Sequence, residues 1–163
     1  MIRLTKLAVR LSLATALVIS ATSTIAADTI KIGWLSSLTG ALSSAAIAEN
    51  QGVQLAVDEI NKSGGILGRQ IELLTRDTAG DPTKAVNFAQ QLAFSDKVHF
   101  VIVPVNSGEG LAAVPILARA GVPNLVIGAI DELIDPVKYP RAFRVINTNR
   151  QWISTANDYA IKV

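Results

Sequence analysis

Two apolar patterns alternate along residues 30–163. Short, nearly continuous apolar runs such as 98–105 are typical of parallel-sheet strands buried on both faces. Between these runs, apolar residues recur every three or four positions, as on one face of a helix; 53, 56, 57 and 60 form one such set. The pattern predicts strands at 30–35, 70–76, 98–105, 124–127 and 142–146. It predicts one helix that starts between Ser43 and Glu49 and ends at 60. It predicts further helices at 83–94, 110–120, 131–138 and 151–163.

Strands and helices that alternate at these lengths predict an α/β fold with a doubly wound parallel sheet. Ligands of such open sheets bind beyond the carboxyl ends of the strands. Three predicted loops lie there: 36–46, 106–110 and 128–131. The glycine-rich segment 64–69 runs from a helix into a strand, whereas phosphate loops run from a strand into a helix, so we interpret it as structural.

The first 27 residues have the organisation of a secretory signal peptide. Arg3, Lys6 and Arg10 form a basic segment, 11–19 is a short apolar run, and small residues allow cleavage near residue 26 or 27, after Ala26 or Ala27. The alternative is an uncleaved anchor helix, which the shortness of the apolar run disfavours. We therefore expect an exported, periplasmic protein whose mature part is 28–163.

Charge and composition narrow the function further. The chain has 15 basic and 13 acidic residues; cleavage would remove three basic residues and leave 12 against 13, a net charge of −1. The sequence contains no basic run that would track phosphates, so we expect no nucleic-acid partner. It has no cysteine and one histidine, His99, which disfavours thiol catalysis, histidine-based metal sites and a catalytic triad. We expect no metal, no cofactor and no enzyme activity. Glu72 and Asp77 are not interpreted as a catalytic pair.

Two segments carry a family resemblance. Residues 30–35 with Thr39-Gly40, and the segment 58–82 (DEINKSGGILGRQIELLTRDTAGDP), resemble the leucine/isoleucine/valine-binding family of periplasmic solute-binding proteins. The resemblance implies a type I periplasmic-binding fold, with two α/β lobes that enclose a small solute for an ABC permease. Residues 28–163 would then be an incomplete N-terminal lobe with strand order 2-1-3-4-5, and the second lobe would be missing.

The same resemblance implies a set of ligand-binding residues. The hydroxyl of Ser107 would bind the carboxylate of the solute, beside Gly108 at a helix N-terminus; the alternative is that Ser107 is only an N-cap. Gly128 would contribute a backbone contact. Ile130 stands where amino-acid binders have a threonine, and Ala45 stands where branched-chain binders have an aromatic residue. The first difference removes one hydrogen bond and disfavours an α-amino-acid ligand, and the second leaves room for a larger solute. The alternatives are that Ile130 merely packs under the loop and that a neighbouring residue fills the space at Ala45.

Three interpretations of the function remain open. The chain is the substrate-binding component of an ABC importer for amino acids or related carboxylates and amides; or it is a non-functional truncated remnant; or it is a ligand-sensing receptor lobe.

The resemblance also bears on two positions without cysteine. Two cysteines that are paired in some relatives match Gly80 and Asn106 here, and both are absent. His99 is expected to be solvated, away from the cleft.

Overall fold

The computed structural model describes residues 29–162, so the predicted signal peptide at 1–27 lies outside the described residues. Five strands form one sheet: β1 (Ile30–Ser36), β2 (Ile71–Asp77), β3 (Phe100–Val103), β4 (Asn124–Val126) and β5 (Ala142–Arg144). Every pairing is parallel and the order is β2-β1-β3-β4-β5, which confirms the predicted topology.

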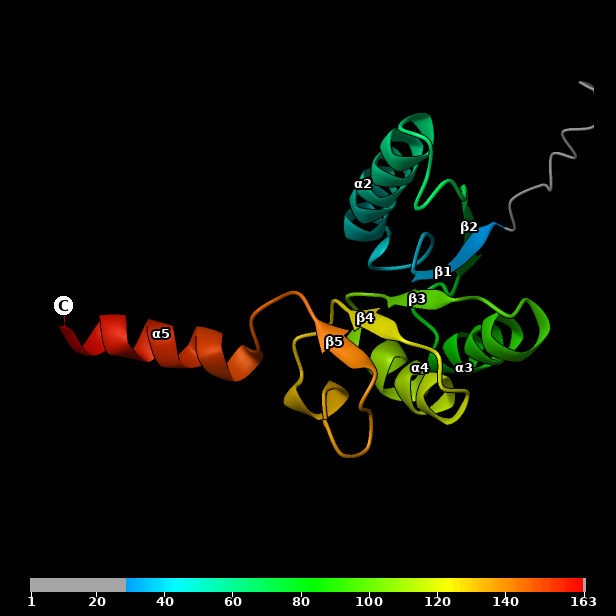
Figure 1. Cartoon of the computed structure of the whole chain (residues 1–163). Helices are drawn as coiled ribbons and strands as arrows, with labels where there is room; N and C mark the ends of the chain where they lie inside the picture. Colours follow the sequence, from blue (N-terminus) through cyan, green and yellow to red (C-terminus); the bar gives the residue numbers. More distant parts are fainter. Residues whose placement is uncertain (1–28, 163) are drawn as a thin grey trace, which may run out of the picture.

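The helices cover the two faces of the sheet unequally. They are α2 (Ser43–Lys62), α3 (Pro82–Gln90), α4 (Ser107–Arg119) and α5 (Asn149–Lys162), with a π-helical turn at Gln91–Ser95 and a 3-10 turn at Asp131–Leu133. In Figure 1, α3 and α4 lie together on one face, α2 lies alone on the other, and α5 projects away from the sheet towards the C-terminus.

Some predicted elements are shorter in the structure, for local reasons. The helix predicted at 131–138 is wrong beyond Leu133, because the Asp135 side chain accepts the Val137 and Lys138 amides and forms a turn around Pro136. The strand predicted at 98–105 ends at Val103, before Pro104, which has no amide hydrogen to donate to the sheet.

The face of the sheet under α3 and α4 is completely buried. Val101, Val103 and Val126 point to this side and are inaccessible to solvent, as are Leu92 and Leu117 from the covering segments. A Cβ atom at Gly33 would lie only 2.8 Å from Leu92 Cδ1. Glycine at this position therefore lets the covering layer pack directly against the middle of the sheet.

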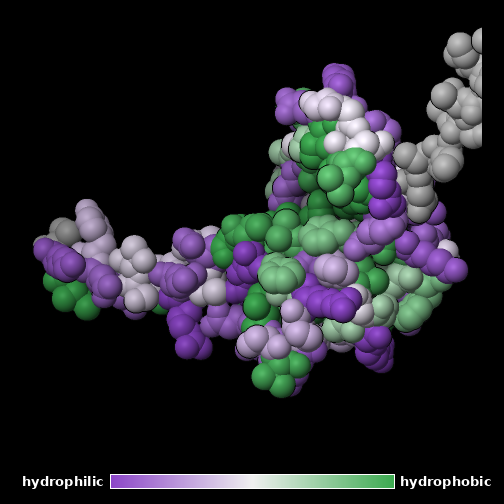
Figure 2. All heavy atoms as spheres, in the orientation of Figure 1, coloured by the Kyte–Doolittle hydropathy of each residue, from purple (hydrophilic) through white to green (hydrophobic). Residues whose placement is uncertain are grey.

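The opposite face is only partly covered. Leu125 lies between Ile102 and Phe143 in a row across β3, β4 and β5. Leu125 and Ile102 are half-buried, and Phe143 is 56% exposed. Figure 2 shows hydrophobic residues gathered between α2 and these strands. Because α2 contacts the sheet chiefly at β2, it leaves this apolar row open.

Candidate functional site

The sheet has a topological switch point between β1 and β3. From β1 the chain continues to β2 on one side, and β3 pairs on the other. In open α/β sheets ligands bind in the crevice outside the carboxyl ends of the strands at such a point. Because all five strands are parallel, the loops that follow β1, β3 and β4 lie at this same edge.

The loop after β3 leads directly into the N-terminus of α4. The Asn106 side chain accepts a hydrogen bond of 3.1 Å from the Gly108 amide, so Asn106 is the N-cap and the alternative role predicted for Ser107 is wrong. Ser107 is the first residue of the helix and is half-buried, while Gly108 is exposed beside it. The positive end of the helix dipole at this position favours an anionic group.

Gly128 lies next to Ser107. A Cβ atom built on Gly128 would lie 3.2 Å from Ser107 Oγ and would overlap with Leu133 Cδ1. Any side chain at this position would therefore displace Leu133, which is fully buried beneath the loop. The structure thus brings together the two residues that the family resemblance assigns to the carboxylate of the solute.

The other predicted site residues contribute differently. Ala45 was expected in the loop after the first strand, but it is exposed in the first turn of α2, because the helix already begins at Ser43. Ile130 is half-buried and packs against the buried core, so its side chain fills space under the loop. Its carbonyl accepts hydrogen bonds from Leu133 N (3.3 Å) and from Arg144.

The structure adds a buried polar pair at the switch point. Ser37 Oγ donates a hydrogen bond of 2.7 Å to Glu109 Oε2, joining the loop after β1 to the first turn of α4. Glu109 is completely buried, and its Oε1 atom has no hydrogen-bond partner among the described residues. The sequence signal was a glutamate three residues after an asparagine N-cap, the spacing of a capping box. Here the carboxylate reaches across to Ser37 instead.

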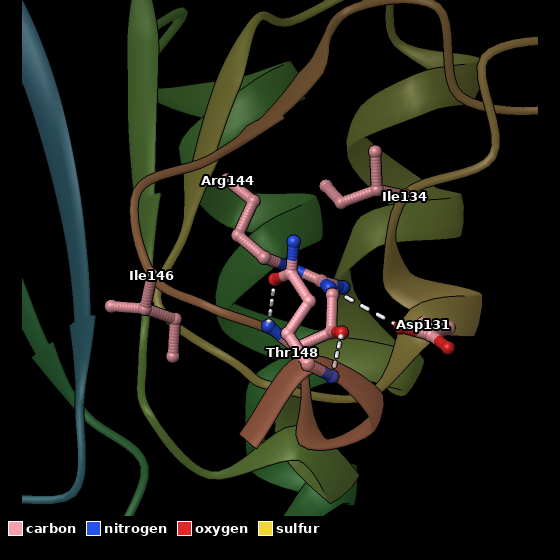
Figure 3. Close-up of a pocket in the computed structure, with 6 residues that line it drawn as sticks. Asp131, Ile134, Arg144, Ile146 and Thr148 are labelled. Carbon is pink, nitrogen blue, oxygen red and sulfur yellow. Dashed lines mark hydrogen bonds and ion pairs between the residues drawn. The ribbon is translucent and has the colours of Figure 1, made fainter. Parts of the chain in front are cut away.

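A cavity of about 450 Å³ opens at the carboxyl ends of β4 and β5. Its lining residues are Asp131, Ile134, Arg144, Ile146, Thr148 and Gln151. Figure 3 shows Arg144 directed towards Asp131. At the start of α5 the Thr148 amide donates a hydrogen bond to Gln151 Oε1, and the Gln151 amide donates one to Thr148 Oγ1. The Arg144 side chain is 10% exposed, and its Nε atom has no hydrogen-bond partner among residues 29–162. Sequence reasoning did not single out this arginine, since one charged residue in a short strand carries no motif.

The two acidic residues of β2 do not form a pair. Glu72 and Asp77 are five positions apart on one strand, so their side chains point to opposite faces of the sheet. Desolvation by burial raises the pKa of Asp77, but hydrogen bonds from Thr39, Ala79 and Leu38 together outweigh it and hold the pKa below its usual range. Asp77 thus organises the loop after β1, accepting 2.8 Å from Thr39 Oγ1.

Two more sequence features have structural roles. His99 is exposed at the amino end of β3, where its Nδ1 accepts a hydrogen bond of 3.1 Å from the Lys31 amide. The glycine-rich segment 64–69 forms a turn between α2 and β2, closed by a bridge between Ile66 and Arg69. Within the described residues, histidine and acidic side chains form no cluster of three that could hold a metal ion, and no helix is long and apolar enough to cross a membrane.

The positions of two cysteines in some relatives are adjacent in this fold. A Cβ atom on Gly80 would lie 3.9 Å from Asn106 Nδ2. The match of the two positions, expected from the resemblance, is therefore consistent with the geometry. In this chain Asn106 caps α4 instead.

Comparison with known proteins places the chain in a family. A family model described as periplasmic binding protein matches residues 29–163, which include the whole described region. The chain therefore belongs to the periplasmic binding protein family, as the resemblance of its motifs predicted.

The names of individual relatives mention amino acids or benzoate as ligands. The leucine-, isoleucine-, valine-, threonine- and alanine-binding protein of Pseudomonas aeruginosa is 34% identical over 84% of this chain and 36% of the relative. The branched-chain amino acid transporter substrate-binding protein of Streptococcus pneumoniae, solved in complex with isoleucine, has a TM-score of 0.70 and 36% identity over 74% of this chain and 34% of its own. A solute-binding protein of R. palustris, solved in complex with benzoate, has a TM-score of 0.68 and 28% identity, over 76% of this chain and 34% of its own. The chain thus spans about a third of the length of these relatives.

Proposed function

We propose that residues 28–163 form the N-terminal-lobe side of the solute site in the substrate-binding component of an ABC importer. The observation that carries the proposal is the close approach of Ser107 and Gly128, where the loops after β3 and β4 meet beside the switch point of the sheet. The Ser107 hydroxyl and the N-terminal end of α4 supply hydrogen-bond donors and a positive dipole end for a carboxylate. The protein acts by binding and not by catalysis, in keeping with its family.

The proposed solutes are amino acids or related small carboxylates and amides. Relatives in complex with isoleucine and with benzoate share a carboxylate joined to an apolar group. Ile130 packs into the core, so the loop of Gly128 would contribute backbone rather than a side-chain hydroxyl. This arrangement supports recognition of the carboxylate in this lobe and leaves the apolar part of the solute for other contacts.

Export to the periplasm and docking on a membrane permease complete the proposal. Cleavage of residues 1–27 near Ala26 or Ala27 would release the binding protein from its signal peptide. Mass spectrometry of the exported protein should give an N-terminus at residue 27 or 28. An exported protein that retains Met1 or Ile2 would contradict the cleavage.

Solute affinity should depend on Ser107. We expect Ser107→Ala to weaken leucine binding about tenfold or more, because a hydrogen bond to a charged group contributes about 1.5–3 kcal/mol. The measurement is an NMR titration of residues 28–163 with leucine and, separately, benzoate, followed at the Gly108 and Gly128 amides. Ser95→Ala, an exposed serine beyond α3, is the matched control and should bind as the wild type does.

Affinity of this region alone should be low. Residues 28–163 correspond to about a third of the length of these relatives, and tight sites enclose most of the surface of their ligand. We expect dissociation constants of about 1 mM or higher for residues 28–163. Micromolar affinity of this region would show that one lobe is a sufficient receptor, and unchanged affinity in Ser107→Ala would remove Ser107 from the site.

A further inference from the structure

The loop that carries Gly128 is held in place from the side of β5. Arg144 Nη2 donates a hydrogen bond to the Ile130 carbonyl, and Arg144 Nη1 lies 3.7 Å from Asp131 Oδ1 (Figure 3). One guanidinium group therefore contacts two consecutive residues of the loop. Because the Arg144 side chain is nine-tenths buried, solvent screens these contacts much less than it screens surface ion pairs.

The start of α5 contacts the same loop through one backbone hydrogen bond and one exposed ion pair. The Asn149 amide donates a hydrogen bond of 3.0 Å to the Ala129 carbonyl, and Arg150 Nε lies 3.1 Å from Asp131 Oδ2. The Arg150 side chain is 84% exposed, however, and exposed ion pairs contribute little. Arg144 is thus the buried charged group on which the geometry of the loop depends.

The loop has little freedom once these contacts are made. Gly128 precedes the anchored residues directly and lies between Ser107 and Leu133, with no room for a side chain. A shift of the 129–131 backbone would therefore move Gly128 relative to Ser107.

We propose that Arg144 is a positioning residue, which holds the loop of residues 128–131 in register with Ser107. Its importance for solute binding rests on the function proposed above. Arginine suits this task because its planar guanidinium presents several donors in a fixed geometry and can satisfy a carbonyl and a carboxylate together. Lysine, with a single ammonium group, would keep the charge opposite Asp131 but would not reproduce both contacts.

Hydrogen exchange tests the positioning role without any solute. The amides of Leu133, Ile134 and Asn149 donate to carbonyls of the loop, at Ile130, Asp131 and Ala129 respectively. We expect these three amides to exchange at least about tenfold faster in Arg144→Met, less so in Arg144→Lys, while amides of β1 and β3 keep their wild-type rates. The matched control is Arg141→Met, since Arg141 also flanks β5 but donates to the Gly121 carbonyl, away from this loop.

A leucine titration of the same variants connects the loop to the site. We expect Arg144→Met to weaken leucine binding about tenfold, Arg144→Lys to recover part of the loss, and Arg141→Met to bind as the wild type does. Uniformly faster exchange across the sheet, or unchanged rates at the three loop amides, would overturn the positioning role. Faster loop exchange with unchanged affinity would overturn its importance for the solute. If the wild type responds to neither leucine nor benzoate, the proposed function fails, whereas the exchange comparison still decides whether Arg144 holds the loop.

Discussion

The two faces of the sheet differ in how completely they are covered. Under α3 and α4, alternate residues of β3 and β4 are fully buried; on the α2 side their neighbours along the same strands are only half-buried. Apart from the buried Asn124, the residues at both sets of positions are apolar, which is the pattern of a strand buried on both faces. The open row of Ile102, Leu125 and Phe143 therefore has the composition of a core but is not packed as one.

Each face also holds one glutamate with an unpartnered oxygen. Glu109 Oε1 lies on the α4 side, and Glu49 Oε2 lies on α2, with no hydrogen-bond partner for either atom among the described residues. The α4-side glutamate keeps one hydrogen bond, from Ser37. Substitutions matched between the two faces can therefore measure what complete burial adds to stability.

The largest expected difference is between two leucines of the same sheet. Leu35 in β1 is fully buried in the α3/α4 core, whereas Leu125 in β4 is half-buried on the α2 side. We expect Leu35→Ala to lower the free energy of unfolding by about 3–5 kcal/mol and Leu125→Ala by less than about 2 kcal/mol, because only the first leaves a closed cavity. Urea unfolding of both variants provides the measurement. Equal losses would mean that the α2 face is packed as tightly as the other.

The elements that the sequence predicted correctly are those with strong periodicity or clear boundaries. The strands of β1 and β2 and the helix α4 follow from apolar runs and turn residues, and the strand order followed from the family resemblance. The start of α2 could not be decided between Ser43 and Glu49, because its small residues carry little periodic signal. The false helix after Leu133 shows how one aspartate side chain can replace helical hydrogen bonds.

The site was predictable only where it lies close to strand ends. Ser107 and Gly128 follow β3 and β4, so topology alone brings them to one edge. Glu109 and Ser37 are 72 residues apart, and their contact depends on the direction of a buried side chain. Arg144 acts through a backbone carbonyl, which no residue type in the sequence marks.

The Ser37–Glu109 contact should have an intermediate effect on stability. Ser37→Ala would leave Glu109 buried without a partner, and we expect a loss of about 1–3 kcal/mol. Adding Glu109→Leu should recover most of this loss, since apolar replacement of both partners is close to neutral. The neighbouring Ser36 is the matched control. Its Oγ atom points to the α2 side, is buried, and has no hydrogen-bond partner in the described region. Ser36→Ala should cost nothing in urea unfolding; a cost equal to that of Ser37→Ala would argue against a special role for the buried pair.

The smallest effect should come from substitution of Glu49, which should raise the free energy of unfolding, whereas the other substitutions lower it. Burial raises the pKa of Glu49, and its neighbour Asn50 ties α2 to β1 by accepting a hydrogen bond of 3.0 Å from Trp34 Nε1. A carboxyl whose pKa is higher in the folded state than in the unfolded state destabilises the fold above that raised pKa, because the folded protein must then carry the charge. This penalty disappears as the pH falls. We therefore expect Glu49→Gln to stabilise the protein at pH 7 by less than about 1 kcal/mol, because solvent screens this partly exposed carboxyl, and we expect the gain to vanish at about pH 4. Urea unfolding at the two pH values measures the gain, with the exposed Glu72→Gln as the control for removal of a surface charge. A gain that persists at low pH would attribute the effect to packing, and a loss at pH 7 would mean that the Glu49 carboxylate is stabilised by contacts on the α2 face.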